Sequence, residues 1–172
     1  MRYLAIDYGE RRIGLATCDE EERFASPHGV RERQGTKRDT VAIVEIVRGL
    51  GIEGIVFGLP RAVDGGTGSS EPAVRKFATS LEEELRAANL PIVLEWWDER
   101  FSTREALGQM RTLGISQKRG RESQGSNSVD ARAAAVILQG FLDRKRGAIV
   151  ENSESLSDET PNRVLGSGDD LF

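Results

Sequence analysis

The chain has 172 residues and one cysteine, Cys18, so the sequence predicts a single domain without an intrachain disulfide, in a reducing, cytoplasmic location. No apolar stretch approaches the ~18 residues that a membrane-spanning helix needs, and the charged N-terminal segment is unlike a secretory signal. The net charge is −4, but residues 147–172 hold six of the 28 acidic and one of the 24 basic residues, which leaves the rest at +1, compatible with a phosphate-rich partner.

Apolar periodicity and turn residues predict the following elements in chain order: strands at 2–7, 12–18 and 23–31, a helix at 38–50, a strand at 53–57, a helix at 71–88, a strand that begins at Pro91, and helices at 103–113 and 128–144. A turn joins the first two strands into an antiparallel hairpin. Alternating helices and strands follow, so we expect an α/β fold with a mixed sheet and flanking helices. Residues 1–146 form the expected domain, and 147–172 an acidic disordered tail.

The periodicity also predicts which side chains face the core. They are Val41, Val44, Ile46, Val47 and Leu50 in the first helix; Val74, Phe77, Ala78, Leu81 and Leu85 in the second; and Val129, Ala133, Val136, Ile137 and Leu138 in the last. The adjacent Trp96 and Trp97 point to opposite faces of their strand, and we expect both to pack in the core. A base-stacking surface is the alternative for one of them.

Three carboxylates occupy positions typical of an active site. Asp7 ends the first strand, Glu99 directly follows the strand "PIVLEWW", and Asp130 lies in the first turn of the last helix. Asp7 is the most informative, because a carboxylate at the end of a central strand needs a cationic partner. Carboxylate oxygens suit Mg²⁺ or Mn²⁺, and a two-metal site made of such ligands hydrolyses phosphodiester bonds. One His and one Cys make a zinc site a poor fit.

Each acid also has a simpler explanation. Asp7 is also suited to a turn. Glu99 is close enough in sequence to pair with Arg100 or Arg104, and Asp130 is placed to interact with the dipole of its own helix. Residue types and spacing alone leave both explanations open.

The segments that contain these acids resemble a known family. "AIDYGERRIGLA", "GIVFGLPRAVDGGTG", "DERFSTREA" and "SVDARAAAVILQGFL" have the order and spacing of the YqgF/RuvX family of RNase H-like proteins, over roughly residues 1–145. The resemblance implies an RNase H-like fold, active-site acids at Asp7, Glu99 and Asp130, and a role in maturing the 5′ end of pre-16S ribosomal RNA. Holliday junction resolution in DNA is the alternative that it implies. The loop 114–127 departs from the family pattern, which leaves the substrate preference open.

Basic residues near the acids are candidates for binding the substrate backbone. Arg11 and Arg12 follow the turn after Asp7, Arg100 and Arg104 follow Glu99, and the Gly-rich loop 114–127 contains Lys118, Arg119 and Arg121. The alternatives are a solvated hairpin turn, local ion pairs and plain solvation, respectively.

The expected partner is a nucleic acid, either an RNA precursor or branched or single-stranded DNA. A non-catalytic nucleic-acid-binding protein and an ATP-binding protein are less favoured functions, the second because its fold requires about twice this length. The sequence leaves monomer and homodimer open. The terminal Leu171 and Phe172 follow two acidic residues and suggest a short docking peptide for a protein partner, although a polar tail that ends in two apolar residues is the simpler explanation.

Overall fold

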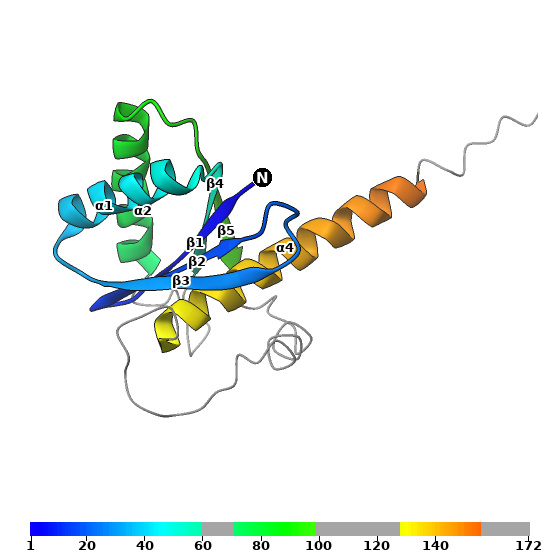
Figure 1. Ribbon diagram of the computed structural model, residues 1–172, viewed down its shortest axis with the longest axis horizontal. Helices are drawn as coiled ribbons and strands as arrows, with labels where there is room; N and C mark the ends of the chain where they lie inside the picture. Colours follow the sequence, from blue (N-terminus) through cyan, green and yellow to red (C-terminus); the bar gives the residue numbers. More distant parts are fainter. Residues whose placement is uncertain (60–70, 99–127, 156–172) are drawn as a thin grey trace, which may run out of the picture.

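A computed structural model describes residues 1–59, 71–98 and 128–155, with side chains to residue 148 (Figure 1). The elements are β1 (Tyr3–Tyr8), β2 (Arg12–Cys18), β3 (Ala25–Glu32), α1 (Thr36–Leu50), β4 (Gly54–Leu59), α2 (Glu71–Ala87), β5 (Val93–Asp98) and α4 (Val129–Ser155). Every strand predicted from the sequence is present, as are the predicted helices at 38–50, 71–88 and 128–144. The helix expected at 103–113 and the loop 114–127 lie outside the described residues.

The five strands form one mixed sheet in the order β3-β2-β1-β4-β5. β1 pairs antiparallel with β2, and β2 pairs antiparallel with β3, whereas β1–β4 and β4–β5 are parallel. The predicted α/β fold with an N-terminal antiparallel hairpin is therefore confirmed. Because β1, β4 and β5 run in one direction, their carboxyl ends meet at one edge of the sheet, and β1, which carries Asp7, is the central strand.

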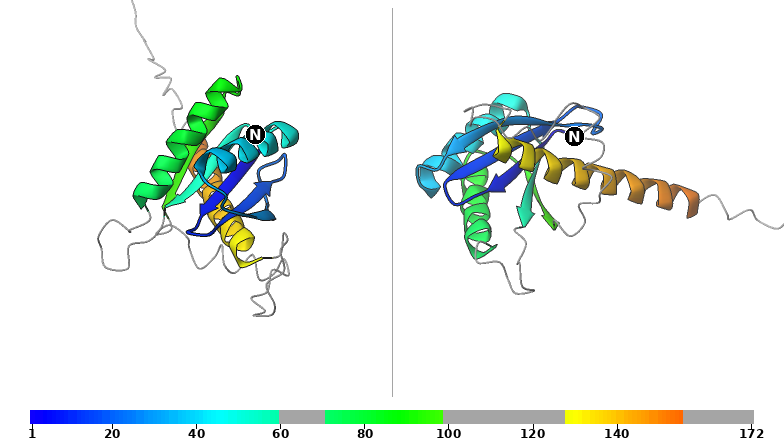
Figure 2. Two further views of the ribbon diagram at one scale, coloured as in Figure 1. Left: turned by 90° about the vertical axis from the view of Figure 1, so that its left-hand side faces the viewer. Right: turned by 90° about the horizontal axis from the view of Figure 1, so that it is seen from below.

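The helices cover both faces of the sheet (Figures 1 and 2). α1 and α2 pack on one face around a core that includes Leu4, Ile6, Phe57 and Phe77. α4 crosses the other face, where its buried stripe meets Tyr3, Ala5 and Trp97. Alternate residues of β1 thus face opposite layers, and this alternation puts Asp7 on the same face as Tyr3 and Ala5, the face that α4 covers.

Val41 and Val129 were predicted to lie in the core, and both predictions are wrong for the same reason. Val41 is 43% exposed and Val129 is 69% exposed. Val41 lies two positions before the buried Ile43, and Val129 lies two positions before the buried Ala131, so each is on nearly the opposite side of its helix from that residue. The predicted stripe of α2 is confirmed at all five positions: Val74, Phe77, Ala78, Leu81 and Leu85.

The prediction that Trp96 packs in the core is also wrong. Trp97 is buried as expected, but Trp96 is 36% exposed on the edge strand β5. Its ring packs on Phe57 with a centroid distance of 5.3 Å, and the guanidinium of Arg75 lies 4.9 Å above it. An edge strand has no neighbour beyond it to complete the burial of a side chain this large.

α4 is longer than predicted, since it continues to Ser155 and projects beyond the sheet (Figure 1). Its last residues, from Gly147 to Ser155, fall in the segment that we expected to be a disordered tail. Once a helix is nucleated, each added residue gains a backbone hydrogen bond, so a helix can extend past the surface that supports it. The domain boundary at residue 146 stays a prediction. Within the described part of the chain, no helix is long and apolar enough to cross a membrane.

Candidate active site

Asp7 and Asp130 are brought together by Gly14, which lies between them. Asp7 pairs directly with Gly14 across β1 and β2, and directly paired residues in a sheet present the same face. On that face a β-carbon at Gly14 would lie 2.1 Å from the main-chain oxygen of Asp130, so α4 begins in van der Waals contact with the strand. Two of the three predicted acids therefore flank one glycine on the same face of the sheet, although they are far apart in the sequence.

Small residues allow this close approach along α4 as far as Gly140. A β-carbon at Gly58 of β4 would lie 2.4 Å from Cδ1 of Ile137, and one at Gly140 of α4 would lie 2.7 Å from the ring of Trp97. The helix face itself is rich in alanine, with Ala131, Ala134 and Ala135 buried. Glycine inside strands often marks such a contact. That signal was present at Gly14 and Gly58 but was not used in the sequence analysis.

The first turn of α4 is held by its own cap. The Oγ of Ser128 accepts a hydrogen bond from the main-chain N–H of Ala131 at 3.3 Å, and the Ser128 carbonyl accepts one from Arg132 at 3.1 Å. This is the bonding pattern of a helix N-cap. It fixes the main chain on both sides of Asp130 and so limits where its carboxylate can lie.

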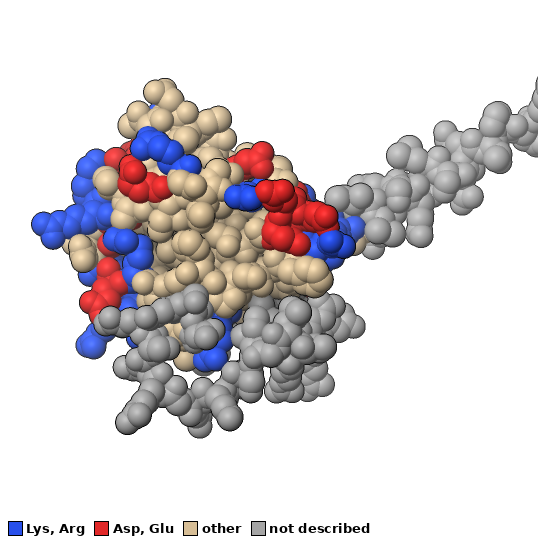
Figure 3. Space-filling model, viewed as in Figure 1, with Lys and Arg blue, Asp and Glu red and all other residues tan. Residues whose placement is uncertain are grey.

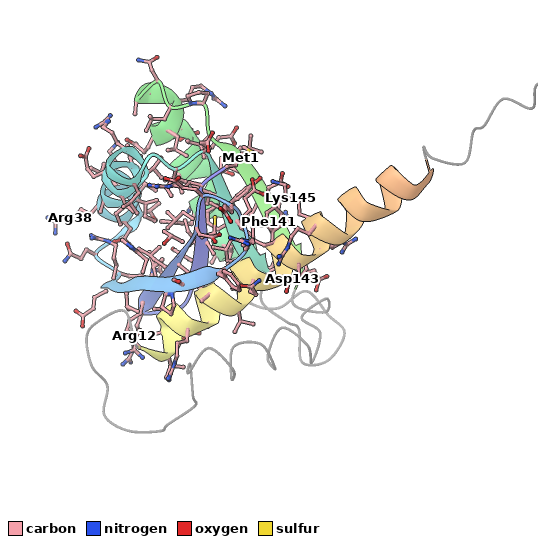
Figure 4. All side chains as sticks on the ribbon, turned by 45° about the vertical axis from the view of Figure 1, so that its right-hand side comes forward. Met1, Arg12, Arg38, Phe141, Asp143 and Lys145 are labelled. Carbon is pink, nitrogen blue, oxygen red and sulfur yellow. The ribbon has the colours of Figure 1, made fainter. Side chains whose placement is uncertain are left out.

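Arg12 lies beside the first turn of α4 (Figure 4), where it contacts Asp130 directly. Its Nε lies 2.9 Å from Oδ2 of Asp130, and the two side chains are 42% and 29% exposed. The contact is an ion pair, but it lacks the geometry of a hydrogen bond. Oδ2 of Asp130 is therefore a buried oxygen with no hydrogen-bond partner in the described part of the chain. From the sequence, Arg12 was a candidate for binding the substrate backbone; its pairing with one of the predicted acids was missed.

Arg33 fixes the turn that follows Asp7. The main-chain N–H of Gly9 donates to the carbonyl of Arg12 at 2.9 Å, which closes the hairpin. The guanidinium of Arg33 donates to the carbonyls of Gly9 and Glu10 at 3.3 and 2.8 Å and lies 4.4 Å from the centroid of the Tyr8 ring. Burial raises the pKa of the Tyr8 hydroxyl, so the ring stays neutral beneath the cation. Sequence reasoning missed Arg33, because it lies beyond the predicted third strand.

The structure describes only part of the predicted site. Arg11 is exposed at the hairpin turn. Glu99, Arg100, Arg104, Lys118, Arg119 and Arg121 lie outside the described residues. Among the described residues, no three His, Cys, Asp or Glu side chains are grouped closely enough to hold a metal ion. Glu99 directly follows Asp98, where β5 ends at the same sheet edge as β1 and two strands away from it.

The residues that are described fit a divalent cation. Asp7 and Asp130 would supply hard carboxylate oxygens, the ligands that Mg²⁺ and Mn²⁺ prefer. Oδ2 of Asp130, buried and without a hydrogen-bond partner in the described residues, is an oxygen that a cation would satisfy. Figure 3 shows basic and acidic side chains mixed along the edge on the side of α1, and a group of acidic side chains over the middle of α4.

The fold is similar to that of a protein whose structure includes a Holliday junction. The chain superposes on Thermus thermophilus RuvC in complex with a Holliday junction substrate with a TM-score of 0.55 and 15% identity, over 86% of this chain and 97% of that one. A structure of the same protein described without substrate gives a TM-score of 0.53. The fold is therefore that of the RuvC-type, RNase H-like nucleases.

The sequence comparisons give the family. The model for RuvX, described as a Holliday junction resolvase, matches residues 1–144. A protein of Anaeromyxobacter dehalogenans (strain 2CP-C) named "Putative pre-16S rRNA nuclease" is 43% identical over 145 residues, 84% of this chain and 98% of the relative. One of the same name from Syntrophomonas wolfei is 34% identical, over 83% of this chain and 94% of the relative. The chain belongs to the YqgF/RuvX family and is a nuclease.

Proposed function

We propose that this chain is a metal-dependent nuclease with Asp7, Glu99 and Asp130 as its ligands, and that it matures the 5′ end of pre-16S ribosomal RNA. The observation that supports the metal site most strongly is the contact of Gly14 with Asp130, because it joins the two acids at the carboxyl edge of the sheet. Glu99 follows the last residue of β5 at that edge. The RNA substrate follows from the name that the relatives share.

The three acids would hold Mg²⁺ or Mn²⁺, and a pair of such ions would activate a water molecule for attack on the phosphodiester and stabilise the departing oxygen. The chain's own residues supply position and charge. The main chain of Asp130 is fixed by Ser128 and Gly14, and that of Asp7 by its pairing with Gly14. Arg33 holds the turn after β1, so that Arg11 and Arg12 stay beside the acids, where their charge favours a phosphate.

A cleavage assay with Mg²⁺ or Mn²⁺ tests this function. It compares a ribosomal precursor RNA that carries the unprocessed 5′ end, a four-way DNA junction and single strands of both kinds, each with the wild-type chain and with Asp7→Asn. Metal-dependent shortening of the precursor by the wild type alone would support the proposal. Equal cleavage in excess EDTA would overturn the metal dependence, and an intact precursor beside a cleaved junction would overturn the RNA substrate.

Junction resolution is the second candidate, favoured by the description of the family model and by the likeness to RuvC in fold. A resolvase cuts two symmetric strands and needs a symmetric dimer to do so. Paired cuts in a four-way junction by a species that sediments as a dimer would support this candidate. The rRNA role would place the chain in the cytoplasm with the ribosome precursors, in agreement with its single buried cysteine.

A further inference from the structure

Arg12 and Asp130 form an ion pair inside the proposed metal site. Arg12 begins β2 two residues before Gly14, and the alternation of the strand puts it on the face that α4 covers. From there its Nε comes within 2.9 Å of Oδ2 of Asp130. The cation of one candidate substrate-binding residue thus lies on the carboxylate of one candidate metal ligand.

A guanidinium and a divalent cation are alternative partners for that carboxylate. Both need close approach to oxygen, and two cations repel each other across so short a distance. The guanidinium is always charged, so a change of pH does not remove it from Asp130. The pair is partly exposed, and ion pairs of this kind are weak, so a metal ion can displace Arg12 at small cost.

We propose that Arg12 exchanges between two anions, the Asp130 carboxylate and a phosphate of the substrate, and that metal binding drives the exchange. This inference rests on the proposed metal site. A guanidinium released from Asp130 presents several N–H donors in a planar arrangement that matches phosphate oxygens. Arg12 then couples the two binding events: it opposes the metal when substrate is absent and strengthens substrate binding when metal is present. By linkage, metal and substrate each raise the affinity for the other.

The first test measures binding of Mn²⁺ alone to the full chain by isothermal titration calorimetry. The variants are Arg12→Gln, which removes the competing cation, and Arg11→Gln, which removes the same charge from the neighbouring, exposed residue. We expect Arg12→Gln to bind Mn²⁺ about two- to fivefold more tightly than wild type, the range that an exposed ion pair accounts for. Arg11→Gln should change the affinity less. Arg12→Lys keeps the charge and should stay near the wild-type value.

The second test measures coupling without catalysis. Binding of a fluorescent oligonucleotide with a cleavage-resistant backbone is followed by anisotropy, with Ca²⁺ and with EDTA. Wild type should bind more tightly in Ca²⁺, and this metal-dependent gain should be at least halved in Arg12→Gln. Arg11→Gln should lose affinity for the oligonucleotide by the same factor in Ca²⁺ and in EDTA, and should therefore keep the metal-dependent gain.

The outcomes separate this inference from the proposed function. If Asp7→Asn and Asp130→Asn bind Mn²⁺ as tightly as wild type, the metal site itself is wrong. If both lose Mn²⁺ binding while Arg12→Gln binds the metal no more tightly than Arg11→Gln, the metal site stands and the exchange is wrong. Thermal unfolding of each variant verifies the fold. If Arg12→Gln misfolds, Arg12→Met replaces it with the same expectations: tighter Mn²⁺ binding and a smaller metal-dependent gain than in Arg11→Gln support exchange, and unchanged values overturn it.

Discussion

The α-carbon of Gly14 lies against the main-chain carbonyl of Asp130, so closely that a β-carbon would come within 2.1 Å of that oxygen. An alanine at this position must push the start of α4 away from β2. We expect Gly14→Ala to lower the free energy of unfolding by about 1–3 kcal/mol, the usual cost of overpacking. Because Asp130 moves with the helix, nuclease activity should fall by more than the decrease in stability explains. Urea unfolding and a cleavage assay on folded protein check both effects.

Gly29→Ala is the matched control for this prediction. Gly29 lies in β3 of the same sheet, and a β-carbon there would meet nothing within 4 Å. The variant should keep the wild-type activity and nearly the wild-type stability. If Gly14→Ala behaves in the same way, α4 does not depend on the close contact at residue 14.

Asp7→Asn keeps the shape of the side chain and removes its charge from the proposed metal site. Activity should fall by several orders of magnitude in saturating Mg²⁺ or Mn²⁺, because the neutral amide is a poor metal ligand. The fold should survive, since Asp7 is only partly buried. Single-turnover cleavage together with circular dichroism separates the two effects. Cleavage at the wild-type rate would show that Asp7 is not part of the site.

The basic loop of Lys118, Arg119 and Arg121 is predicted to bind the nucleic-acid backbone and not its bases. Replacing all three with glutamine should weaken binding to unrelated sequences by similar factors. The slope of log affinity against log salt concentration should become shallower, by up to about one unit for each phosphate that the loop no longer neutralises. Filter binding between low and moderate salt measures the slope. An unchanged slope would leave the loop with no role in binding.

Glu22 and Lys145 join the β2–β3 turn to α4, and this link makes part of the stability depend on pH. Burial alone would raise the pKa of Glu22, but hydrogen bonds from Lys145 at 2.6 Å and from the N-terminal amine at 2.7 Å lower it below 4.5. A carboxylate with a lowered pKa stabilises the fold above its unfolded pKa. The contribution is therefore lost as the pH falls from 4.5 through the lowered value.

Glu22→Gln should accordingly destabilise the protein at pH 7 by less than about 1 kcal/mol, since the pair is partly exposed. The difference from wild type should shrink as the pH falls from 4.5 towards the lowered pKa. Urea unfolding at several pH values measures it, with Glu83→Gln on the exposed side of α2 as the control. A difference that stays constant down to about pH 3, well below the ordinary pKa of a glutamate, would rule out the ionised form as the source of the stability.

The sequence predicted the strands, the described helices and the position of Asp7 because these depend on local patterns. Strand alternation and helical periodicity need only a few consecutive residues, and the stripe of α2 was correct at every position. The errors at Val41 and Val129 arose because each is an apolar residue on the exposed side of its helix that was counted into the buried stripe. The spacing of apolar residues shows that a helix has a buried stripe, but it is less reliable for deciding which residue begins that stripe.

The site was harder to predict, since its geometry depends on contacts between distant segments. No local pattern shows that Gly14 touches Asp130 or that Arg12 pairs with it, because both contacts depend on how α4 crosses the sheet. Glycine inside a strand was the one available signal. Strand ends and the family motifs indicated the three acids, and their role as metal ligands stays a prediction.

The pairing of an early strand with a late helix also affects when activity can arise during synthesis. The β1–β2 hairpin carries Asp7 and forms from neighbouring residues, whereas Asp130 belongs to α4, which leaves the ribosome after the rest of the sheet. Folding on the ribosome proceeds from the N-terminus, so a nascent chain holds Asp7 before it holds Asp130. If both acids are needed for cleavage, as proposed, an unfinished copy would leave nearby RNA and DNA intact until α4 packs on the sheet.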